Sequence, residues 1–74
     1  MYMNYTQKCN ILNHIMEFDI KPFLWKNFHN QIINDPEFMN RAIFVFQKYV
    51  WYLINEKQLG RRAILIKIGI DAEG

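Results

Sequence analysis

Residues 35–60 read DPEFMNRAIFVFQKYVWYLINEKQLG, and this stretch decides the fold of the 74-residue chain. Asp35 occupies an N-cap position and Pro36 the first helical position, an order that favours the start of a helix. Gly60 can adopt the left-handed conformation in which many helices end. Apolar residues fill much of the interval, and no Gly or Pro interrupts them. The stretch therefore predicts one long helix over about residues 36–59.

The length and composition of the chain indicate a single small globular domain over residues 1–74. Half of the residues are hydrophobic, which excludes a disordered chain. The single cysteine, Cys9, cannot form a disulfide within the chain, and this indicates a reducing compartment. The N-terminus lacks the basic and then apolar order of a signal peptide. The longest apolar run is shorter than the roughly 20 residues that cross a bilayer, so we expect a soluble, cytoplasmic protein that does not enter a membrane.

Two shorter helices are predicted before the long one. The first covers about residues 6–18, with Thr6 as its N-cap and a stripe of apolar residues on one face. Pro22 disfavours a helical conformation at the residue before it, so we expect the first helix to stop there. Pro22 can then open a second helix over about residues 22–33. The expected fold is therefore mainly α, with three helices and a different element at the C-terminus.

In the C-terminal segment the spacing of the apolar residues changes from that of a helix to every second position. Isoleucine falls at every second position and β-branched residues are frequent, which predicts a short β-strand over about residues 63–70. A helix is the competing interpretation, and Gly69 argues against it. The strand places four isoleucines on one face: Ile64, Ile66, Ile68 and Ile70.

A strand needs a partner for its backbone N–H and C=O groups. Within the chain only residues 1–5 could supply one, and the alternatives are a second copy or another protein. Antiparallel pairing of two copies is self-complementary. We therefore expect a homodimer formed through residues 63–70 and the long helix.

The residues that could take part in catalysis or bind a metal do not form a recognisable set. His14 lies five residues from Cys9, about 140° around a helix, and His29 belongs to another predicted helix. Close pairs of ligands, which zinc sites use, are missing from the sequence. No pair of carboxylates is placed for acid–base catalysis. We expect no catalytic residues, no metal and no cofactor, so an enzyme is not expected.

Arg61 and Arg62 follow the end of the predicted long helix. Cations at this place usually interact with the negative end of the helix dipole. The alternative is that the two arginines contact a phosphate group.

One sector of the long helix carries aromatic side chains that packing within the chain does not require. Its polar side carries Phe44 and Trp51, which alternate with the cations Arg41 and Lys48, and exposed aromatics beside Arg are enriched at interfaces. The ordinary explanation is that the two shorter helices cover one side of the long helix and the C-terminal segment covers the other. The expected partner-binding residues are Arg41, Phe44, Lys48, Trp51 and Tyr52.

We therefore expect a small non-enzymatic regulator or inhibitor that binds a larger cytoplasmic protein through this aromatic and basic face. The alternative is a nucleic-acid-binding accessory protein, which the small net charge of +2 does not favour. Binding to a membrane surface is a third class, and the mixed polar face of the long helix argues against it. The abundance of residues with AT-rich codons is consistent with a phage or mobile-element origin.

Overall fold

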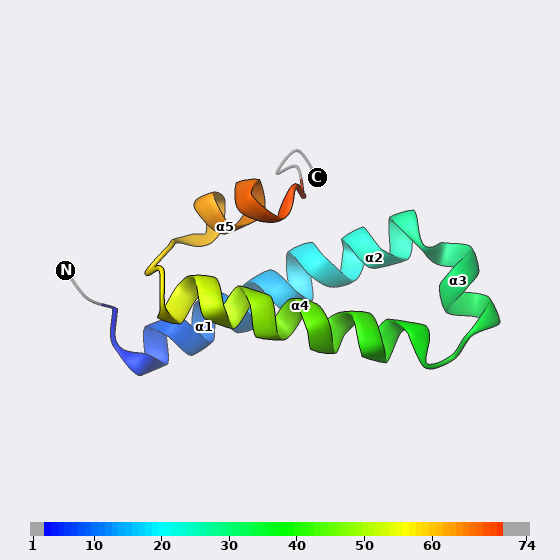
Figure 1. Cartoon of the computed structure of the whole chain (residues 1–74), viewed down its shortest axis with the longest axis horizontal. Helices are drawn as coiled ribbons and strands as arrows, with labels where there is room; N and C mark the ends of the chain where they lie inside the picture. The colour runs from blue at the N-terminus through cyan, green and yellow to red at the C-terminus, as the bar shows by residue number, and fades with distance from the viewer. Residues whose placement is uncertain (1–2, 71–74) are drawn as a thin grey trace.

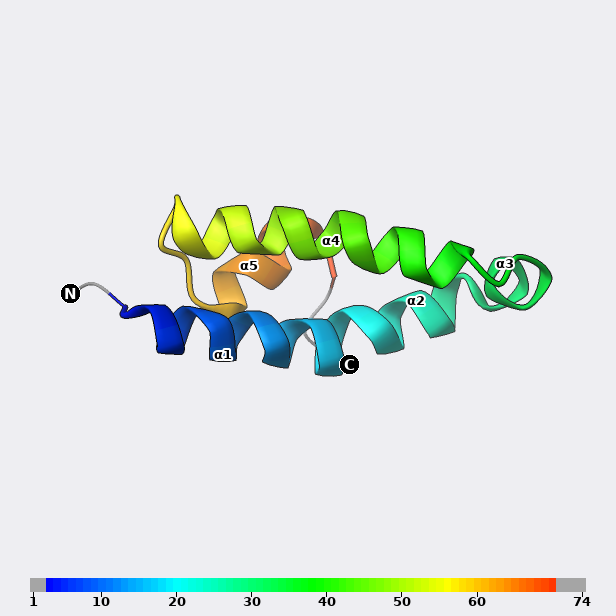
Figure 2. The ribbon, with the colours of Figure 1, turned by 90° about the horizontal axis from the view of Figure 1, so that it is seen from below.

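The computed structural model describes residues 3–70, which form two antiparallel helical arms and a short helix laid across them (Figure 1). The first arm comprises α1 (Tyr5–Ile15), the π-helical segment η1 (Met16–Ile20) and α2 (Lys21–Asn27). Figure 2 shows these three segments end to end, beside the second arm. Helix α3 (His29–Asn34) turns the chain at the far end, and α4 (Phe38–Asn55) forms the second arm.

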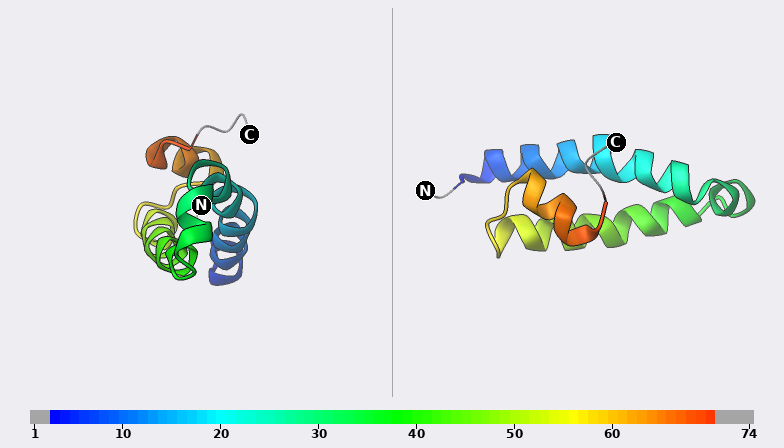
Figure 3. Two further views of the ribbon diagram at one scale, coloured as in Figure 1. Left: turned by 90° about the vertical axis from the view of Figure 1, so that its right-hand side faces the viewer. Right: turned by 90° about the horizontal axis from the view of Figure 1, so that it is seen from above.

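Helix α5 (Arg61–Ile68) lies on one side of the pair of arms (Figure 3). The molecule is elongated, with dimensions of 44 × 24 × 15 Å. Among residues 3–70, no helix is both long enough and apolar enough to span a bilayer.

The first arm begins with a capping box. The Asn4 side chain accepts a hydrogen bond from the Gln7 backbone N–H at 2.8 Å, and the Gln7 side chain accepts one from the Asn4 backbone N–H at 2.9 Å. Two backbone donors at the helix start are thereby satisfied. The predicted N-cap, Thr6, was therefore wrong, because the helix already starts at Tyr5.

The predicted break before Pro22 was also wrong. The chain passes through Pro22 because η1 widens the helix by one residue, so that the Lys21 N–H donates to the carbonyl of Met16. In a regular helix the proline ring would meet the carbonyl four residues earlier, and a local π turn relieves this clash. The predicted helices at residues 6–18 and 22–33 are thus replaced by one continuous arm that ends at Asn27.

The first arm ends before Phe28, whose backbone leaves the helical region with φ −129° and ψ 31°. The amide of Asn27 donates a hydrogen bond to the carbonyl of Phe23 at 3.0 Å. Such side-chain bonds offer the backbone an alternative to regular helix. The ring of Phe28 packs 5.6 Å from that of Phe38, which holds the turn against the start of α4.

Asp35 is not the N-cap of the long helix as expected, because α4 starts at Phe38 with Glu37 at its N-cap and without a side-chain capping bond. The Asp35 carboxylate accepts a hydrogen bond from the Glu37 N–H at 3.1 Å. The predicted end at Gly60 was wrong, because α4 ends at Asn55. Gln58 adopts the left-handed conformation there, with φ 56°, and its side chain donates to the carbonyl of Asn55.

The predicted strand at residues 63–70 was wrong, because these residues form most of α5 and its C-terminal cap. Gly69 has φ +85°, its N–H donates to the carbonyl of Ile66, and the N–H of Ile70 donates to the carbonyl of Leu65. This is the Schellman motif, in which a left-handed glycine follows the helix and the next apolar residue packs back on it. The glycine that argued against a helix therefore ends one.

The four isoleucines of this segment do not share a face. Ile64 and Ile70 are buried, Ile68 is partly buried, and Ile66 is 71% exposed. No residue between 3 and 70 is in a β-strand, so the strand-paired dimer loses its basis. The proposed strand mate, residues 1–5, includes residues 1 and 2, which lie outside the described residues, and its last residue already belongs to α1.

The core lies where both arms meet α5. It contains Leu12, Ile15, Met16, Ile20, Leu24, Val50, Leu53, Ile54, Ile64, Leu65 and Ile70. Burying one such side chain contributes about 1.5–3 kcal/mol. Two polar contacts position the elements around this core. Lys8 donates to Asn55 at 3.1 Å between the arms, and Arg61 of α5 is bound to Asp19 of η1.

Candidate protein-binding face

Helix α4 has one side that nothing in the described part of the chain covers. The first arm and α5 pack against its buried residues, which include Val50, Leu53 and Ile54. The opposite side is exposed, and we call it the outer face of α4. It consists of Arg41, Phe44, Val45, Lys48, Tyr49 and Tyr52.

The outer face is rich in large apolar groups. The exposed fraction is 58% for Phe44, 64% for Val45, 40% for Tyr49 and 45% for Tyr52. Val45, Tyr49 and Tyr52 follow one another at spacings of four and three residues, and Phe44 lies two turns before Tyr52, so all four belong to one side of the helix. The rings of Tyr49 and Tyr52 stack with their centroids 6.5 Å apart and their planes 15° apart. Four exposed apolar side chains therefore form one continuous stripe.

Two lysines lie against the rings of this face, Lys48 within α4 and Lys57 just after its end. The ammonium group of Lys48 is 4.7 Å from the centre of the Phe44 ring, and that of Lys57 is 6.0 Å from the Tyr52 ring. Such cation–π contacts contribute about 0.5–1 kcal/mol when exposed. They hold the lysine stems along the stripe, so the face presents rings and positive charge together.

Arg41 is fixed at the start of the outer face. Its guanidinium donates to Asp35 at 2.5 Å. This hydrogen bond, together with the one from the Glu37 backbone N–H, lowers the pKa of the Asp35 carboxyl. Both contacts favour the ionised form of a carboxylate. The Asp35 carboxylate thereby binds both the arginine and the turn that precedes α4.

The structure brings together four of the five predicted partner-binding residues: Arg41, Phe44, Lys48 and Tyr52. Trp51 lies apart from them and is partly buried. Its ring contacts that of Tyr5 edge to face, with the centroids 5.9 Å apart, at the seam between α4 and α1. Tyr49 was missed by the sequence analysis, although its place one residue from Lys48 and three from Tyr52 puts it on the same side.

The seam end of the molecule also holds the lone cysteine. Cys9 is partly buried, one helical turn after Tyr5. The neighbouring Cys9 side chain raises the pKa of the Tyr5 hydroxyl. His14 packs on Phe18 at 4.8 Å, and His29 on Trp25 at 4.6 Å.

The histidines and the cysteine thus have separate neighbours. Within residues 3–70, no group of three or more His, Cys, Asp or Glu side chains could hold a metal ion.

The two arginines of α5 have different surroundings. Arg61 donates two hydrogen bonds to the Asp19 carboxylate, at 2.9 and 2.7 Å, and this carboxylate raises the pKa of the guanidinium. Arg62 is exposed. Arg61 stands at the first residue of α5 and not at the end of the long helix, so the expected interaction with the C-terminal dipole of that helix was wrong. Its charge is already matched by a carboxylate.

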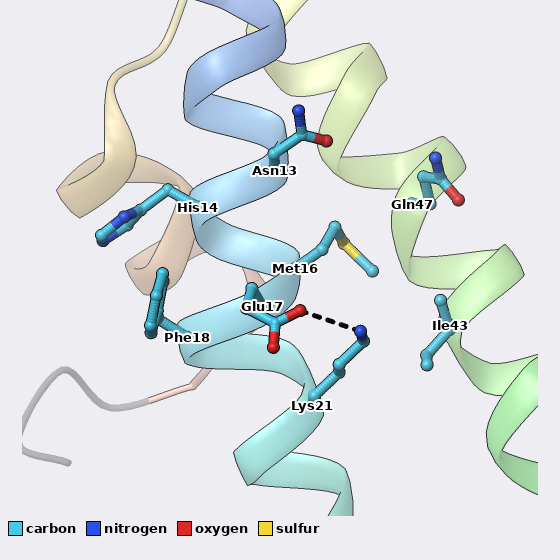
Figure 4. A pocket seen from close by; sticks show the side chains of 8 residues that line it. All are labelled: Asn13, His14, Met16, Glu17, Phe18, Lys21, Ile43 and Gln47. Atoms are coloured by element: carbon cyan, nitrogen blue, oxygen red, sulfur yellow. Dashed lines mark hydrogen bonds and ion pairs between the residues drawn. The ribbon is translucent and has the colours of Figure 1, made fainter.

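A shallow depression of about 620 Å³ lies between the two arms on the surface (Figure 4). Glu17 and Lys21 form an ion pair at 2.9 Å on its side. Figure 4 shows that His14 and Phe18 point away from α4, while Met16 and Ile43 point into the space between the arms. The polar groups that line the depression therefore do not converge on one point, and they do not form an acid and base pair suited to catalysis.

Comparisons of the chain with protein families, with curated proteins and with solved structures found no match. Any functional conclusion therefore rests on the geometry of the chain itself. Of the surfaces described above, the outer face of α4 is the one where apolar and charged side chains gather.

Proposed function

We propose that this chain is a non-enzymatic protein-binding module, a small regulator or inhibitor that docks on a larger protein through the outer face of α4. The observation that carries the proposal is the stripe of four exposed apolar side chains beside two cations. Aromatic residues and arginine are enriched at protein interfaces, and tyrosine and arginine are frequent among the residues that dominate binding energy.

The rigidity of this platform supports the proposal. Val50, Leu53 and Ile54 fix the inner side of α4 in the core, so the outer side chains are held on a helix that is already formed. A preformed surface loses less conformational entropy on binding than a flexible one. The stripe also follows the spacing by which helices pack against grooves and other helices.

The proposal is tested by capture with surface variants. Immobilised wild-type protein is mixed with lysate of its native host, beside Val45→Glu and the matched control Ile66→Glu. Both substitutions place one carboxylate on an exposed apolar position, but only position 45 lies on the outer face of α4. We expect a protein that is retained by the wild type and by Ile66→Glu and is lost with Val45→Glu. Equal retention by all three, or by none, contradicts the proposed function.

A further inference from the structure

Two lysines on the outer face of α4, Lys48 and Lys57, have no opposite charge bound to them within the described part of the chain. The three ion pairs among residues 3–70 use other cations, namely Lys21, Arg41 and Arg61. The face therefore carries two ammonium groups whose charge is left to solvent or to a bound partner.

Both ammonium groups lie on rings near the ends of the apolar stripe. That of Lys48 is 4.7 Å from the centre of the Phe44 ring, and that of Lys57 is 6.0 Å from the centre of the Tyr52 ring. Phe44 and Tyr52 are eight residues apart in the sequence, which corresponds to about 12 Å along the helix. A partner that covers both rings therefore also displaces water from both ammonium groups.

The loss of this water decides the chemistry of the partner. Burying an ammonium group without an opposite charge is costly, and buried charges in proteins are paired. An apolar partner would leave both lysines unpaired, and a second copy of the chain would bring two more cations to the contact. A partner with a carboxylate near each ring would pair both ammonium groups and cover the stripe between them.

The acids at the two ends of α4 argue against an extended anionic surface such as duplex DNA or an acidic membrane. Glu37 is the N-cap residue and Glu56 the C-cap residue, and both are exposed. The 18 residues of α4 lie between them, a length of about 27 Å. A surface of uniform negative charge along this whole length would meet the two carboxylates as well as the lysines. A protein segment avoids them if its own acids are about 12 Å apart.

An amphipathic α-helix supplies this spacing. Residues seven or eight apart on a helix lie on the same side, separated by about 10–12 Å. This separation matches the distance along α4 between Phe44 and Tyr52. Apolar residues of such a helix, three or four positions from either acid, would lie on the stripe. Helices commonly bind other surfaces through anchors at this spacing.

We propose that the outer face of α4 binds an acidic amphipathic helix of another protein, in which two carboxylates seven or eight residues apart pair with Lys48 and Lys57. The proposal rests on the proposed function, because it names the chemistry of the partner for the same face. Charge complementarity selects among partners and speeds their association, so this binding should weaken as salt rises.

The test is selection of binders to the purified chain from a displayed library of amphipathic helices. All helices share one apolar stripe, and the positions that border it are randomised among Glu, Gln and Lys. We expect the wild type to enrich Glu at two positions seven or eight residues apart. Against Lys48→Glu combined with Lys57→Glu, we expect enrichment of Lys at the same positions.

The matched control combines Lys26→Glu with Lys67→Glu. It changes the net charge equally, at two exposed lysines on α2 and α5, and should select the same helices as the wild type. Circular dichroism checks that both double variants keep the helical fold. For a selected helix, replacing its two Glu by Gln should weaken binding about tenfold, measured by fluorescence anisotropy.

Three results overturn the inference. The first is enrichment of Gln or Lys by the wild type, or the absence of any binder. The second is a set of helices that Lys48→Glu with Lys57→Glu binds as tightly as the wild type does. The third is tighter binding to phosphatidylserine vesicles or to duplex DNA than to the selected helix, lost with the same two substitutions.

Failure of this inference differs from failure of the proposed function. If Glu is not enriched but a lysate protein is still retained through position 45, the acidic helix alone is disproved. If Glu is not enriched and no lysate protein is retained, both are disproved.

Discussion

Arg61, the first residue of α5, donates two hydrogen bonds to Asp19 of η1, at 2.9 and 2.7 Å. The carboxylate that receives them is largely covered, with 10% of its side chain exposed. The contact joins residues 42 positions apart in the sequence. A π-helical segment in the first arm and the start of the last helix are thereby held in a fixed relation.

Removing this contact should loosen α5 without unfolding the arms. In Arg61→Ala we expect faster hydrogen exchange at the amides of residues 64–68, because local opening of α5 no longer has to break the ion pair. Arg62→Ala is the matched control, since the neighbouring arginine makes none of the ion pairs among the described residues. Equal exchange in the two variants would mean that the contact does not hold α5.

The isoleucines of α5 should differ sharply in their contribution to stability. Ile64→Ala leaves a cavity at a fully buried position, and we expect a loss of about 2–4 kcal/mol in the free energy of unfolding. Ile66→Ala changes an exposed side chain and should stay within about 0.5 kcal/mol of the wild type. Urea unfolding measures both. Similar losses would fit a strand with both residues on one face and would contradict the helix.

The C-terminal cap of α5 should contribute to stability through the left-handed backbone of Gly69. Gly69→Ala should lower the free energy of unfolding by about 1 kcal/mol, because an L-residue is strained at the φ of +85°. No atom lies within 4 Å of the added methyl group, so the loss reports backbone strain and not a clash. Gly60→Ser, at φ −86°, should cause no such loss, because serine is a favourable N-cap. If thermal unfolding shows equal losses, the Schellman cap is not the cause.

Acid should weaken the start of α4. The Arg41 guanidinium and the Glu37 N–H hold the pKa of Asp35 below its ordinary value of 3.8. The carboxylate therefore contributes stability above its unfolded-state pKa, and this contribution is lost as the pH falls through the lower folded-state pKa. Unfolding of the wild type below about pH 4 should depend on pH more steeply than that of Asp35→Asn. Parallel pH profiles of the two proteins would contradict this role.

The long helix was predictable because several local signals agreed. Asp35 and Pro36 stand just before its start and apolar residues fill much of the stretch that follows, so its existence did not depend on distant contacts. Its end was less predictable, since Gln58 takes the left-handed conformation although a glycine stands two residues later. Non-glycine residues rarely adopt this conformation, and the sequence contains no signal for it.

A strand was wrongly predicted for the C-terminal segment because isoleucine recurs at every second position there. That pattern hid the helical one, in which Ile64, Leu65 and Ile68 face the core together. The path of the first arm through Pro22 was also not predictable, because a π turn has no clear sequence pattern. Of the candidate site, Arg41, Phe44, Lys48 and Tyr52 were found from helical periodicity. The place of Trp51 depends on Tyr5, which lies 46 residues away.

The most direct test of the binding role of α4 is photo-cross-linking in the native host. A benzophenone amino acid replaces Val45 in one variant and Ile66 in another, since both positions are exposed and apolar. We predict that position 45 yields a discrete cross-linked product and that position 66 does not. Mass spectrometry then identifies the product as a second copy or as another protein. No product at position 45, or the same products at both positions, would contradict the assignment of the outer face of α4 as the binding surface.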